Sequence, residues 1–330
     1  MSIRDGSDPA VLAEAAARLA AGELVALPTE TVYGLGARAD DDAAVARIFA
    51  AKGRPADHPL IVHVADAAQA GRFAAAWPAR AARLTQAFWP GPLTVIVPRA
   101  SGQAAAAAGG QDSIGLRCPS HPVAQALLRE AARQGVPGVA APSANRFGRV
   151  SPTTAAHVAG EFDDTLLILD GGDCEVGIES AIVDCTRDDR AVLLRPGVLG
   201  RAALEAVLGE PLAAPDAAVP RASGTLASHY APRARVRLMD TAPLRAALQV
   251  LGAPARGAPP PVAVYSRMVQ GLPAGLPWRR MPDDAVSAAH DLFAALRALD
   301  DSGAPLIWVE TPPSTPDWEG VRDRLQRAAA

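Results

Sequence analysis

The chain has 330 residues, enough for one large or two ordinary domains, and 49% of them are hydrophobic, with few aromatic side chains. Its net charge is −3, and residues 1–209 carry 19 basic against 23 acidic side chains, which argues against a stand-alone nucleic-acid-binding protein. Its three cysteines have no metal-binding or redox spacing and no 18-residue apolar run occurs, so we expect a soluble protein of the reducing cytoplasm.

Strand and helix patterns alternate through the first two thirds of the chain. Asp8-Pro9 is typical of an N-cap followed by proline at the first helical position, opening an Ala-rich helix to Ala21, and Glu23–Pro28 follows as a short buried strand. Residues 29–36 are predicted to form a polar turn, and Asp40 to cap a helix that ends at Lys52. We then expect strands at 60–64, 93–97, 113–117, 138–141, 166–170, 180–184 and 191–194, with helices at about 66–89, 120–134, 153–162 and 200–208. The alternation predicts an α/β layer structure around a mixed, twisted sheet.

The last third begins with a break in this rhythm. Residues 210–234 are rich in Pro and Ala without periodicity and are predicted to be a linker between a domain over 1–209 and a second domain over 235–330. The second domain has a Rossmann-like alternation of strands near 235–239, 261–265, 277–281 and 305–310 with helices at 241–251, at 284–300 and from about 316.

Several common catalytic motifs do not occur. The only lysine, Lys52, follows Ala51, so there is no Gly-Lys-Ser/Thr of a P-loop, and Gly34-Leu35-Gly36 lacks the third glycine of a dinucleotide fingerprint. Ser143 lies in Ala-Pro-Ser-Ala-Asn and therefore not in a hydrolase nucleophile elbow. His58 and His63 are five residues apart, which fits neither helical nor strand spacing, and we expect no dedicated metal ligands.

Lys52 is distinctive because every other basic side chain is arginine. In Ala51-Lys52-Gly53-Arg54-Pro55 the glycine and proline are typical of a helix C-terminus. A compact ammonium also suits a phosphate or a transferring group, and Gly53 allows close backbone approach. The two interpretations, a helix cap and an anion site, are compatible and both remain open.

Polar and basic residues follow several of the predicted strands and helices. Each alone is explained by ordinary turn chemistry. Ligands of α/β sheets bind beyond strand ends, however, and three arginines with one lysine there indicate a polyanionic ligand such as a nucleoside triphosphate. The residues concerned are Thr31, Lys52, Arg54, His63, Arg117, Ser143, Asn145 and Arg195.

Seven blocks occur in one order, namely Pro28–Leu35, Lys52–Pro55 with Pro59-Leu60, Trp89–Thr94, Arg117–Pro119, Ala141–Asn145, Val150–Thr153 and Leu194–Gly197. Together they closely resemble the YrdC-like threonylcarbamoyl-AMP synthases over about residues 8–209. The linker sequence His229-Tyr230-Ala231-Pro232 and the second α/β domain resemble the longer, two-domain form of that family.

The resemblance implies a YrdC-like twisted mixed sheet with flanking helices plus a smaller Rossmann-like C-terminal domain. It implies an enzyme that joins L-threonine, bicarbonate and ATP, with Mg²⁺ on the phosphates, to give threonylcarbamoyl-AMP and pyrophosphate. Threonylcarbamoyl-transferase partner proteins would then pass the group to tRNA. Contact between this chain and tRNA is accordingly expected to be indirect or weak, and no membrane is involved.

The same resemblance assigns roles by position. Lys52, Arg54, Ser143 and Asn145 would surround the phosphates and the reacting carbamate as the catalytic set. Further ATP contacts would come from His58, Ser113, Ser151, Arg195 and Tyr230, and the threonine pocket from Thr31, His63, Arg117, Ala141 (through its backbone) and Ser180. Arg117 would pair with the amino-acid carboxylate as a bidentate fork. We also expect the linker to act as a lid carrying Tyr230.

The chain departs from the family pattern at three places. His58 stands where the family usually has Asn, which would add pH dependence near neutrality. Ala181 follows Ser180 where a Ser-Thr pair is usual, and Gly224-Thr225-Leu226-Ala227 precedes the His-Tyr-Ala-Pro sequence.

Two alternative functions are weighed against the synthase. One is an RNA-binding or ribosome-associated module of the same fold without synthase activity, which the charge of −4 over residues 1–209 disfavours. The other is a carbamoyl-transfer enzyme of hydrogenase maturation, disfavoured because no zinc-finger or acylphosphatase segments are recognised in the sequence.

Overall fold

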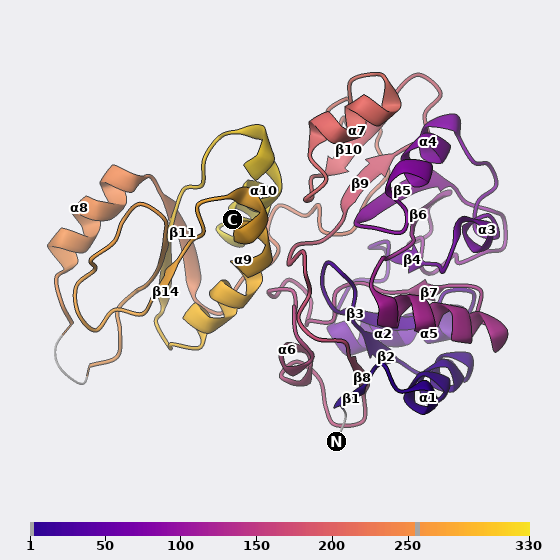
Figure 1. Cartoon of the computed structure of the whole chain (residues 1–330), viewed down its shortest axis with the longest axis horizontal. Coiled ribbons are helices and arrows are strands. Elements are labelled where there is room, and N and C mark those ends of the chain that lie inside the picture. The colour runs from indigo at the N-terminus through magenta and orange to yellow at the C-terminus, as the bar shows by residue number, and fades with distance from the viewer. Residues whose placement is uncertain (1–2, 255–257) are drawn as a thin grey trace. The chain divides into compact units, whose positions relative to one another are not determined.

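The computed structural model describes residues 3–254 and 258–330, which fold into two compact units (Figure 1). The first unit takes the chain as far as Phe147 and then Pro152–Thr225. The second takes the short crossing segment Gly148–Ser151 and the chain from Leu226 onward. The division between Thr225 and Leu226 falls inside the predicted linker, so the two halves of that linker belong to different units.

The first unit is built on a ten-stranded mixed sheet in the order β1-β8-β2-β3-β7-β4-β6-β5-β9-β10. As predicted, it is a mixed α/β sheet. Its strands are β1 (Ile3–Asp5), β2 (Val25–Leu27), β3 (Gly34–Arg38), β4 (Ile61–His63), β5 (Leu93–Pro98), β6 (Ser113–Arg117), β7 (Val139–Ala140), β8 (Leu167–Asp170), β9 (Ala181–Asp184) and β10 (Val192–Arg195).

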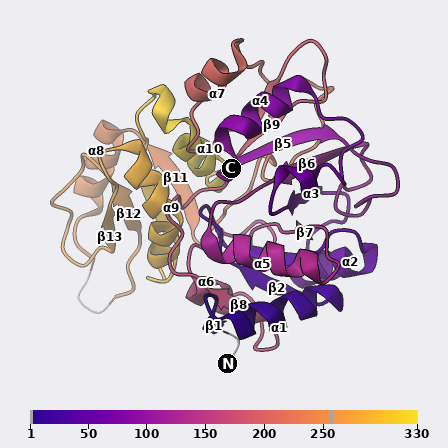
Figure 2. The same cartoon turned by 45° about the vertical axis from the view of Figure 1, so that its right-hand side comes forward.

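Helices cover both faces of this sheet (Figures 1 and 2). One face packs against α2 (Asp42–Lys52), α4 (Ala79–Phe88), α6 (Ala155–Ala159) and α7 (Arg201–Leu208), with the short α3 (Ala67–Ala70) nearby. On the opposite face, α1 (Pro9–Ala20) and α5 (Pro122–Arg133) cover only β8, β2, β3 and β7. The remaining strands of that second face are therefore left for other segments to cover.

The first half of the predicted linker covers this remaining part of the sheet. Ala213, Val219 and Ala222 pack on a small apolar cluster formed by Ile61, Ile96, Ile182, Val192 and Leu194. The Ala213 backbone bridges to β10 at Val192, and Leu212 is 6% exposed. This segment is thus a structural wall of the first unit, as apolar burial would require.

Three local predictions were wrong. The predicted polar turn over residues 29–36 ends too late, because Gly34–Gly36 belongs to strand β3, whose backbone pairs with β2 and β7 although its sequence lacks β-branched residues. The N-cap of α2 is Asp41, whose side chain accepts from the backbone of Ala43 and Ala44, and not Asp40. The short edge strand β1 was missed because three residues carry too little pattern to detect.

The second unit is a four-stranded parallel sheet in the order β11-β14-β12-β13, as expected for a Rossmann-like domain. Its strands are β11 (Arg235–Met239), β12 (Ala263–Ser266), β13 (Trp278–Arg280) and β14 (Leu306–Glu310). Its helices are α8 (Thr241–Leu251), α9 (Ala285–Asp300), η1 (Pro316–Trp318) and α10 (Glu319–Ala328). Helix α8 packs on one face, and α9 and α10 lie on the other (Figure 1).

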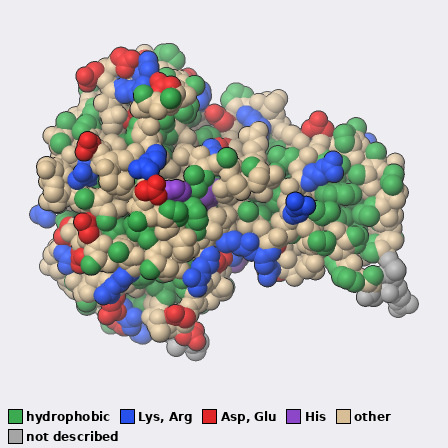
Figure 3. Space-filling view, turned by 180° about the vertical axis from the view of Figure 1, so that it is seen from behind, with side chains coloured by type: hydrophobic (Ala, Val, Ile, Leu, Met, Phe, Trp, Pro, Cys, Tyr) green, Lys and Arg blue, Asp and Glu red, His purple; other side chains and the backbone are tan. Residues whose placement is uncertain are grey.

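The surface of the second unit is more apolar than that of the first. Among the described residues, all five exposed large hydrophobic side chains belong to it: Leu226, Val250, Met268, Trp278 and Val286. Figure 3 shows hydrophobic side chains gathered over this unit. In the part of the chain that the structure describes, none of the helices has the length and apolar character needed to span a bilayer.

Candidate active site

A row of polar side chains crosses the uncovered part of the first sheet. His63 at the end of β4 is paired in register with Arg117 at the end of β6, and Arg117 is paired with Thr94 on β5. Residues paired in register point to the same face of a sheet. The predicted neighbours His63 and Arg117 are therefore brought together, with Thr94 as an additional member of the row that the sequence did not reveal.

Arg117 is held by a buried carboxylate. Its Nη2 donates to Oε1 of Glu30 at 2.8 Å, and both side chains are 4% exposed. The second carboxylate oxygen of Glu30 accepts the backbone N–H of Ser120 at 3.1 Å. The buried Nε of Arg117 has no hydrogen-bond acceptor among the described residues, so it retains a donor for an anionic ligand.

His63 is neutral at physiological pH. Burial, reinforced by the positive charge of Arg117, lowers its pKa to about 3. Its Nδ1 lies 3.2 Å from the carbonyl oxygen of Ile61. A neutral imidazole donates through one nitrogen and accepts through the other, so Nδ1 donates to Ile61 and Nε2 remains an acceptor.

Two other predicted threonine-site residues follow strands β2 and β7 of the same sheet. Thr31 is fully buried, and its hydroxyl is 2.9 Å from the hydroxyl of Thr29 in the turn after β2. Ala141 continues β7 beside β4, where its N–H donates to the carbonyl of Ile61 at 3.0 Å. Its own carbonyl is therefore set at the strand end, where a ligand of an α/β sheet binds.

Ser180 connects this row to Arg195. The Ser180 hydroxyl is hydrogen-bonded to Oγ1 of Thr94 at 2.8 Å and accepts from Nη2 of Arg195 at 3.2 Å. Arg195 also donates to the carbonyl of Ser180 at 3.0 Å and to the carbonyl of Ser223 at 2.8 Å. The predicted ATP contact Arg195 and the predicted threonine contact Ser180 are thus joined directly, and Ser223 ties the linker to both.

Lys52 belongs to a second group of predicted site residues, together with Ser143 and Asn145. It is the last residue of α2, and Gly53 follows in the left-handed conformation with φ of 64°, so the helix-cap interpretation is confirmed. Its Nζ donates to the carbonyl of Ser143 at 2.6 Å and to the carbonyl of Asn145. Three of the four predicted catalytic residues are therefore in contact.

The electrostatic environment of Lys52 is unusual. Its pKa is well below the ordinary lysine value because the ammonium is buried, with Arg54 and Arg146 adding repulsion. Arg54, the fourth predicted catalytic residue, is 8% exposed, and its Nη2 donates to the carbonyl of Pro59 at 3.0 Å. A positive cluster of this kind favours an anion such as a phosphate.

Phe147 joins Arg54 to His58. The Arg54 guanidinium lies 5.6 Å from the ring centroid of Phe147, and the imidazole of His58 contacts the same ring edge-on at 5.5 Å. The pKa of His58 is lowered by partial burial and by Arg54. His58 is therefore placed beside Arg54, through the Phe147 ring that both side chains contact.

The last predicted residues divide between the two units. Ser113 lies on β6, four residues before Arg117 and on the same face. Ser151 and Tyr230 belong to the second unit, where the Tyr230 ring packs 5.3 Å from the ring of Phe293 and 5.5 Å from the Arg324 guanidinium. The prediction that Ser151 and Tyr230 contact ATP stays a prediction.

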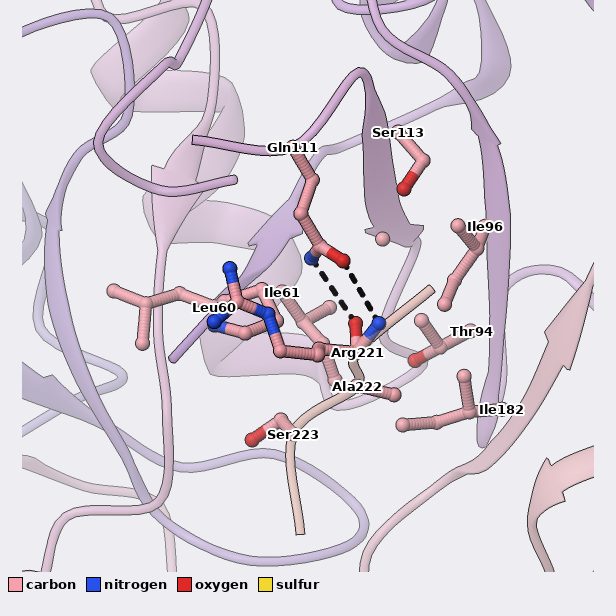
Figure 4. Close-up of a pocket in the computed structure, with 12 residues that line it drawn as sticks. Leu60, Ile61, Thr94, Ile96, Gln111, Ser113, Ile182, Arg221, Ala222 and Ser223 are labelled. Atoms are coloured by element: carbon pink, nitrogen blue, oxygen red, sulfur yellow. Dashed lines mark hydrogen bonds between the residues drawn. The ribbon is translucent and has the colours of Figure 1, made fainter. Parts of the chain in front are cut away.

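A small pocket lies above β5, β6 and β9, between the sheet and the linker (Figure 4). Thr94, Ser113 and Gly115 line its sheet side, and Arg221 and Ser223 line its linker side. Figure 4 shows the carboxamide of Gln111 directed at the backbone of Arg221. Gln111 and Glu30 were both missed from the sequence; Glu30 lies inside a recognised block, and its charge beside a buried strand was the available signal.

No metal centre emerges from this geometry. Among residues 3–254 and 258–330, no group of three or more His, Cys, Asp or Glu side chains is placed to hold an ion. His58 and His63 face different neighbours, Phe147 and Arg117 respectively. All three cysteines are free and buried.

Sequence comparisons give consistent matches over both units. A family model described as "Telomere recombination" matches residues 17–197, and one described as "Threonylcarbamoyl-AMP synthase, C-terminal domain" matches residues 199–330. A threonylcarbamoyl-AMP synthase of Bacillus subtilis is 38% identical, the match covering 98% of this chain and 94% of the relative. One of Pyrococcus abyssi is also 38% identical, over 93% of this chain and 91% of the relative.

A solved structure agrees with these matches. The crystal structure of P. abyssi Sua5 complexed with L-threonine superimposes with a TM-score of 0.86 at 35% sequence identity. The superposition covers 96% of this chain and 94% of that chain.

Proposed function

The chain belongs to the threonylcarbamoyl-AMP synthase family, in its two-domain form, and we infer from this that it joins L-threonine, bicarbonate and ATP to give threonylcarbamoyl-AMP and pyrophosphate. The enzyme is thus an ATP-dependent nucleotidyltransferase that serves tRNA modification. The observation that carries the assignment is the match over nearly the whole chain, together with the polar row and the basic cluster in the first unit.

The reaction has two bond-forming steps. The threonine amine adds to the carbon of bicarbonate, and loss of water leaves a carbamate. A carbamate oxygen then attacks the α-phosphorus of ATP, and the bond to the bridging oxygen breaks as pyrophosphate leaves. Mg²⁺ enters as part of the substrate, MgATP, and neutralises phosphate charge. The protein has to position two anions and compensate their charge.

We assign the threonine end to the row on the sheet. The free Nε donor of Arg117 suits the amino-acid carboxylate, and Glu30 fixes the guanidinium in place. Thr31 and the Nε2 acceptor of neutral His63 would meet the threonine hydroxyl, a contact that valine cannot make. Ser180 and the backbone of Ala141 would complete the pocket.

We assign the phosphates to the Lys52 cluster. Lys52 holds the 143–145 loop by two of its carbonyls and thereby fixes the position of the Ser143 and Asn145 side chains, which we assign to the phosphates together with Arg54. Arg195 extends the cationic surface, the His58 ring adds a polar contact next to Phe147 and Arg54, and Ser113 lies toward the nucleoside. The role of a lid for the linker now concerns the segment from residue 221 onward, since Leu212 is buried and Ala213 and Val219 pack on the sheet.

The setting of the enzyme is also a proposal. Three free, buried cysteines fit a reducing compartment, and we place the protein in the cytoplasm, where threonylcarbamoyl-transferase partners would take the unstable adenylate to tRNA. The alternative of an RNA-binding module without synthase activity is not favoured by the family match.

The test is a direct assay. Purified protein is incubated with ATP, Mg²⁺, L-threonine and labelled bicarbonate, and the labelled adenylate and pyrophosphate are followed. Product must depend on threonine, and valine must not replace it. Absence of both products with all substrates present would overturn the assignment.

A further inference from the structure

The pocket of Figure 4, which we call the slot, lies between the sheet and the linker. Its floor is apolar and is formed by Ile61, Ile96 and Ile182, while Gly115, paired in register with both Ile61 and Ile96, adds no side chain. Its roof is the backbone of residues 221–223, which we call the strap. The space inside the slot is about 20 Å³, room for about one water molecule.

At one end of the slot, Gln111 makes two hydrogen bonds with a single residue of the strap. The backbone N–H of Arg221 donates to its Oε1 at 2.8 Å, and its Nε2 donates to the carbonyl of Arg221 at 3.2 Å. The orientation of the carboxamide is fixed because Nε2 also lies 3.3 Å from the carbonyl oxygen of Ala108. Oε1 is therefore the acceptor and Nε2 the donor presented to the strap.

The same pair of groups is offered by one edge of adenine. The exocyclic N6–H is a donor and N7 an acceptor, and a glutamine carboxamide binds both at once. We propose that Gln111 recognises the adenine of the nucleotide substrate, and that the backbone of Arg221 takes the place of the base when no nucleotide is bound. This inference rests on the proposed function, because it takes the slot beside Ser113 as the base end of an ATP site.

The strap does not depend on Gln111 for its attachment. Nη1 of Arg221 pairs with Oδ2 of Asp57 at 2.8 Å, and its Nη2 donates to the carbonyl of Gly109 at 3.2 Å. Arg195 holds the carbonyl of Ser223. These long side chains allow the backbone to lift while the strap remains attached, and the apolar floor then accepts the face of a purine ring.

Nucleotide binding by the full-length protein tests the recognition. Calorimetric dissociation constants are compared for ATP and for purine riboside triphosphate, which lacks the N6 amino group, in the wild type and in Gln111→Leu. We expect the wild type to bind ATP roughly tenfold tighter than the analogue, and the variant to bind the two equally. An unchanged preference for ATP in Gln111→Leu would overturn the proposal.

We compare the ratio of the dissociation constants for the two nucleotides, because a change in the strap alone affects both constants equally. If Gln111→Leu merely loosens the strap, affinity for both nucleotides changes by the same factor and the ratio stays as in the wild type, which refutes recognition. Gln134→Leu, an exposed glutamine at the end of α5, is the matched control and should retain the wild-type ratio.

Hydrogen exchange of the Arg221 amide tests whether adenine replaces the Arg221 backbone at Gln111. The Arg221 amide donates to Gln111 in the structure, so ATP should speed its exchange as the base takes over that acceptor. Slower exchange of this amide with ATP would contradict the proposal. Binding and hydrogen exchange are both measured without threonine or bicarbonate. If the protein makes threonylcarbamoyl-AMP but its preference for ATP does not depend on Gln111, only this inference is refuted. If the protein fails to bind ATP, the proposed function is refuted.

Discussion

Arg117 and Glu30 form an ion pair at 2.8 Å in which both side chains are only 4% exposed. A buried pair of this kind costs desolvation energy that its attraction barely repays, so stability alone is a weak reason for it. The geometry instead orients the guanidinium, and its buried Nε has no acceptor among the described residues. Glu30 is thus a positioning residue for the arginine that we assign to the threonine carboxylate.

Replacing Glu30 with Gln should weaken threonine binding. The amide keeps the shape and accepts one hydrogen bond but loses the charge that fixes Arg117, so we expect KM for threonine to rise roughly tenfold, the equivalent of about 1.4 kcal/mol. KM for ATP should change much less. Steady-state kinetics with each substrate varied in turn measure both.

A surface pair provides the control for this variant. Glu14→Gln removes an exposed i,i+4 partner of Arg18, and such pairs are worth a few tenths of a kcal/mol at most. It should leave both KM values unchanged. An unaltered KM for threonine in folded Glu30→Gln would show that the ion pair does not position Arg117.

Lys52→Arg should abolish most synthase activity. The two carbonyls that accept from Nζ lie in a buried site fitted to a compact ammonium, and a planar guanidinium cannot occupy it without moving the 143–145 loop. We expect kcat/KM to fall by roughly 100-fold or more, about 2.7 kcal/mol of transition-state stabilisation. The reciprocal surface change Arg133→Lys, at an exposed position of α5, should be neutral. Wild-type activity in Lys52→Arg would show that Lys52 serves only to end the helix.

The sequence predicted this cluster only in part. Gly53 and Pro55 were enough to end α2 at Lys52, because these residues have local backbone preferences. The contact of Lys52 with the loop after β7 depends on chain segments more than 90 residues apart, and only the family resemblance indicated it. Local backbone preferences predict where the helix ends, but the groups that contact its last side chain depend on the tertiary structure.

Strand β3 and the ion pair Glu30–Arg117 show the same difference between what the local sequence predicts and what the tertiary structure determines. Gly34–Arg38 has no strand propensity of its own, and it is a strand because β2 and β7 flank it. Glu30 and Arg117 are both visible in the sequence, but nothing local says that they meet. Apolar strands such as β5 and β6 were predicted well because their burial pattern is carried by the residues themselves.

The linker should be cut after the strap and not before it. Leu212 is buried in the core of the first unit, while Leu226 is 37% exposed at the start of the second. Thermolysin, which cleaves before leucine, should therefore cut at Leu226 long before it cuts at Leu212 in the native protein. Mass spectrometry of the first fragments measures this order, and early cleavage at Leu212 would contradict the wall described for residues 212–223.

His63 should make the protein less stable in acid. Its pKa is about 3 in the folded protein, against an ordinary value near 6.5, because burial and Arg117 disfavour the charged ring. Between these values the unfolded chain binds a proton that the folded chain does not, so the free energy of unfolding falls as pH falls. Above pH 6.5 both states are neutral and this contribution is constant.

Denaturant unfolding of the wild type and of His63→Gln at several pH values between 7.5 and 4.5 measures the effect. We expect the wild-type stability to decline more steeply below about pH 6.5, by up to about 1.4 kcal/mol per pH unit from this group. His121, whose pKa burial also lowers, contributes equally in both proteins and cancels in the difference. Parallel pH profiles would show that His63 is able to take up a proton in the folded protein, and would remove the neutral imidazole on which we base the contact with the threonine hydroxyl.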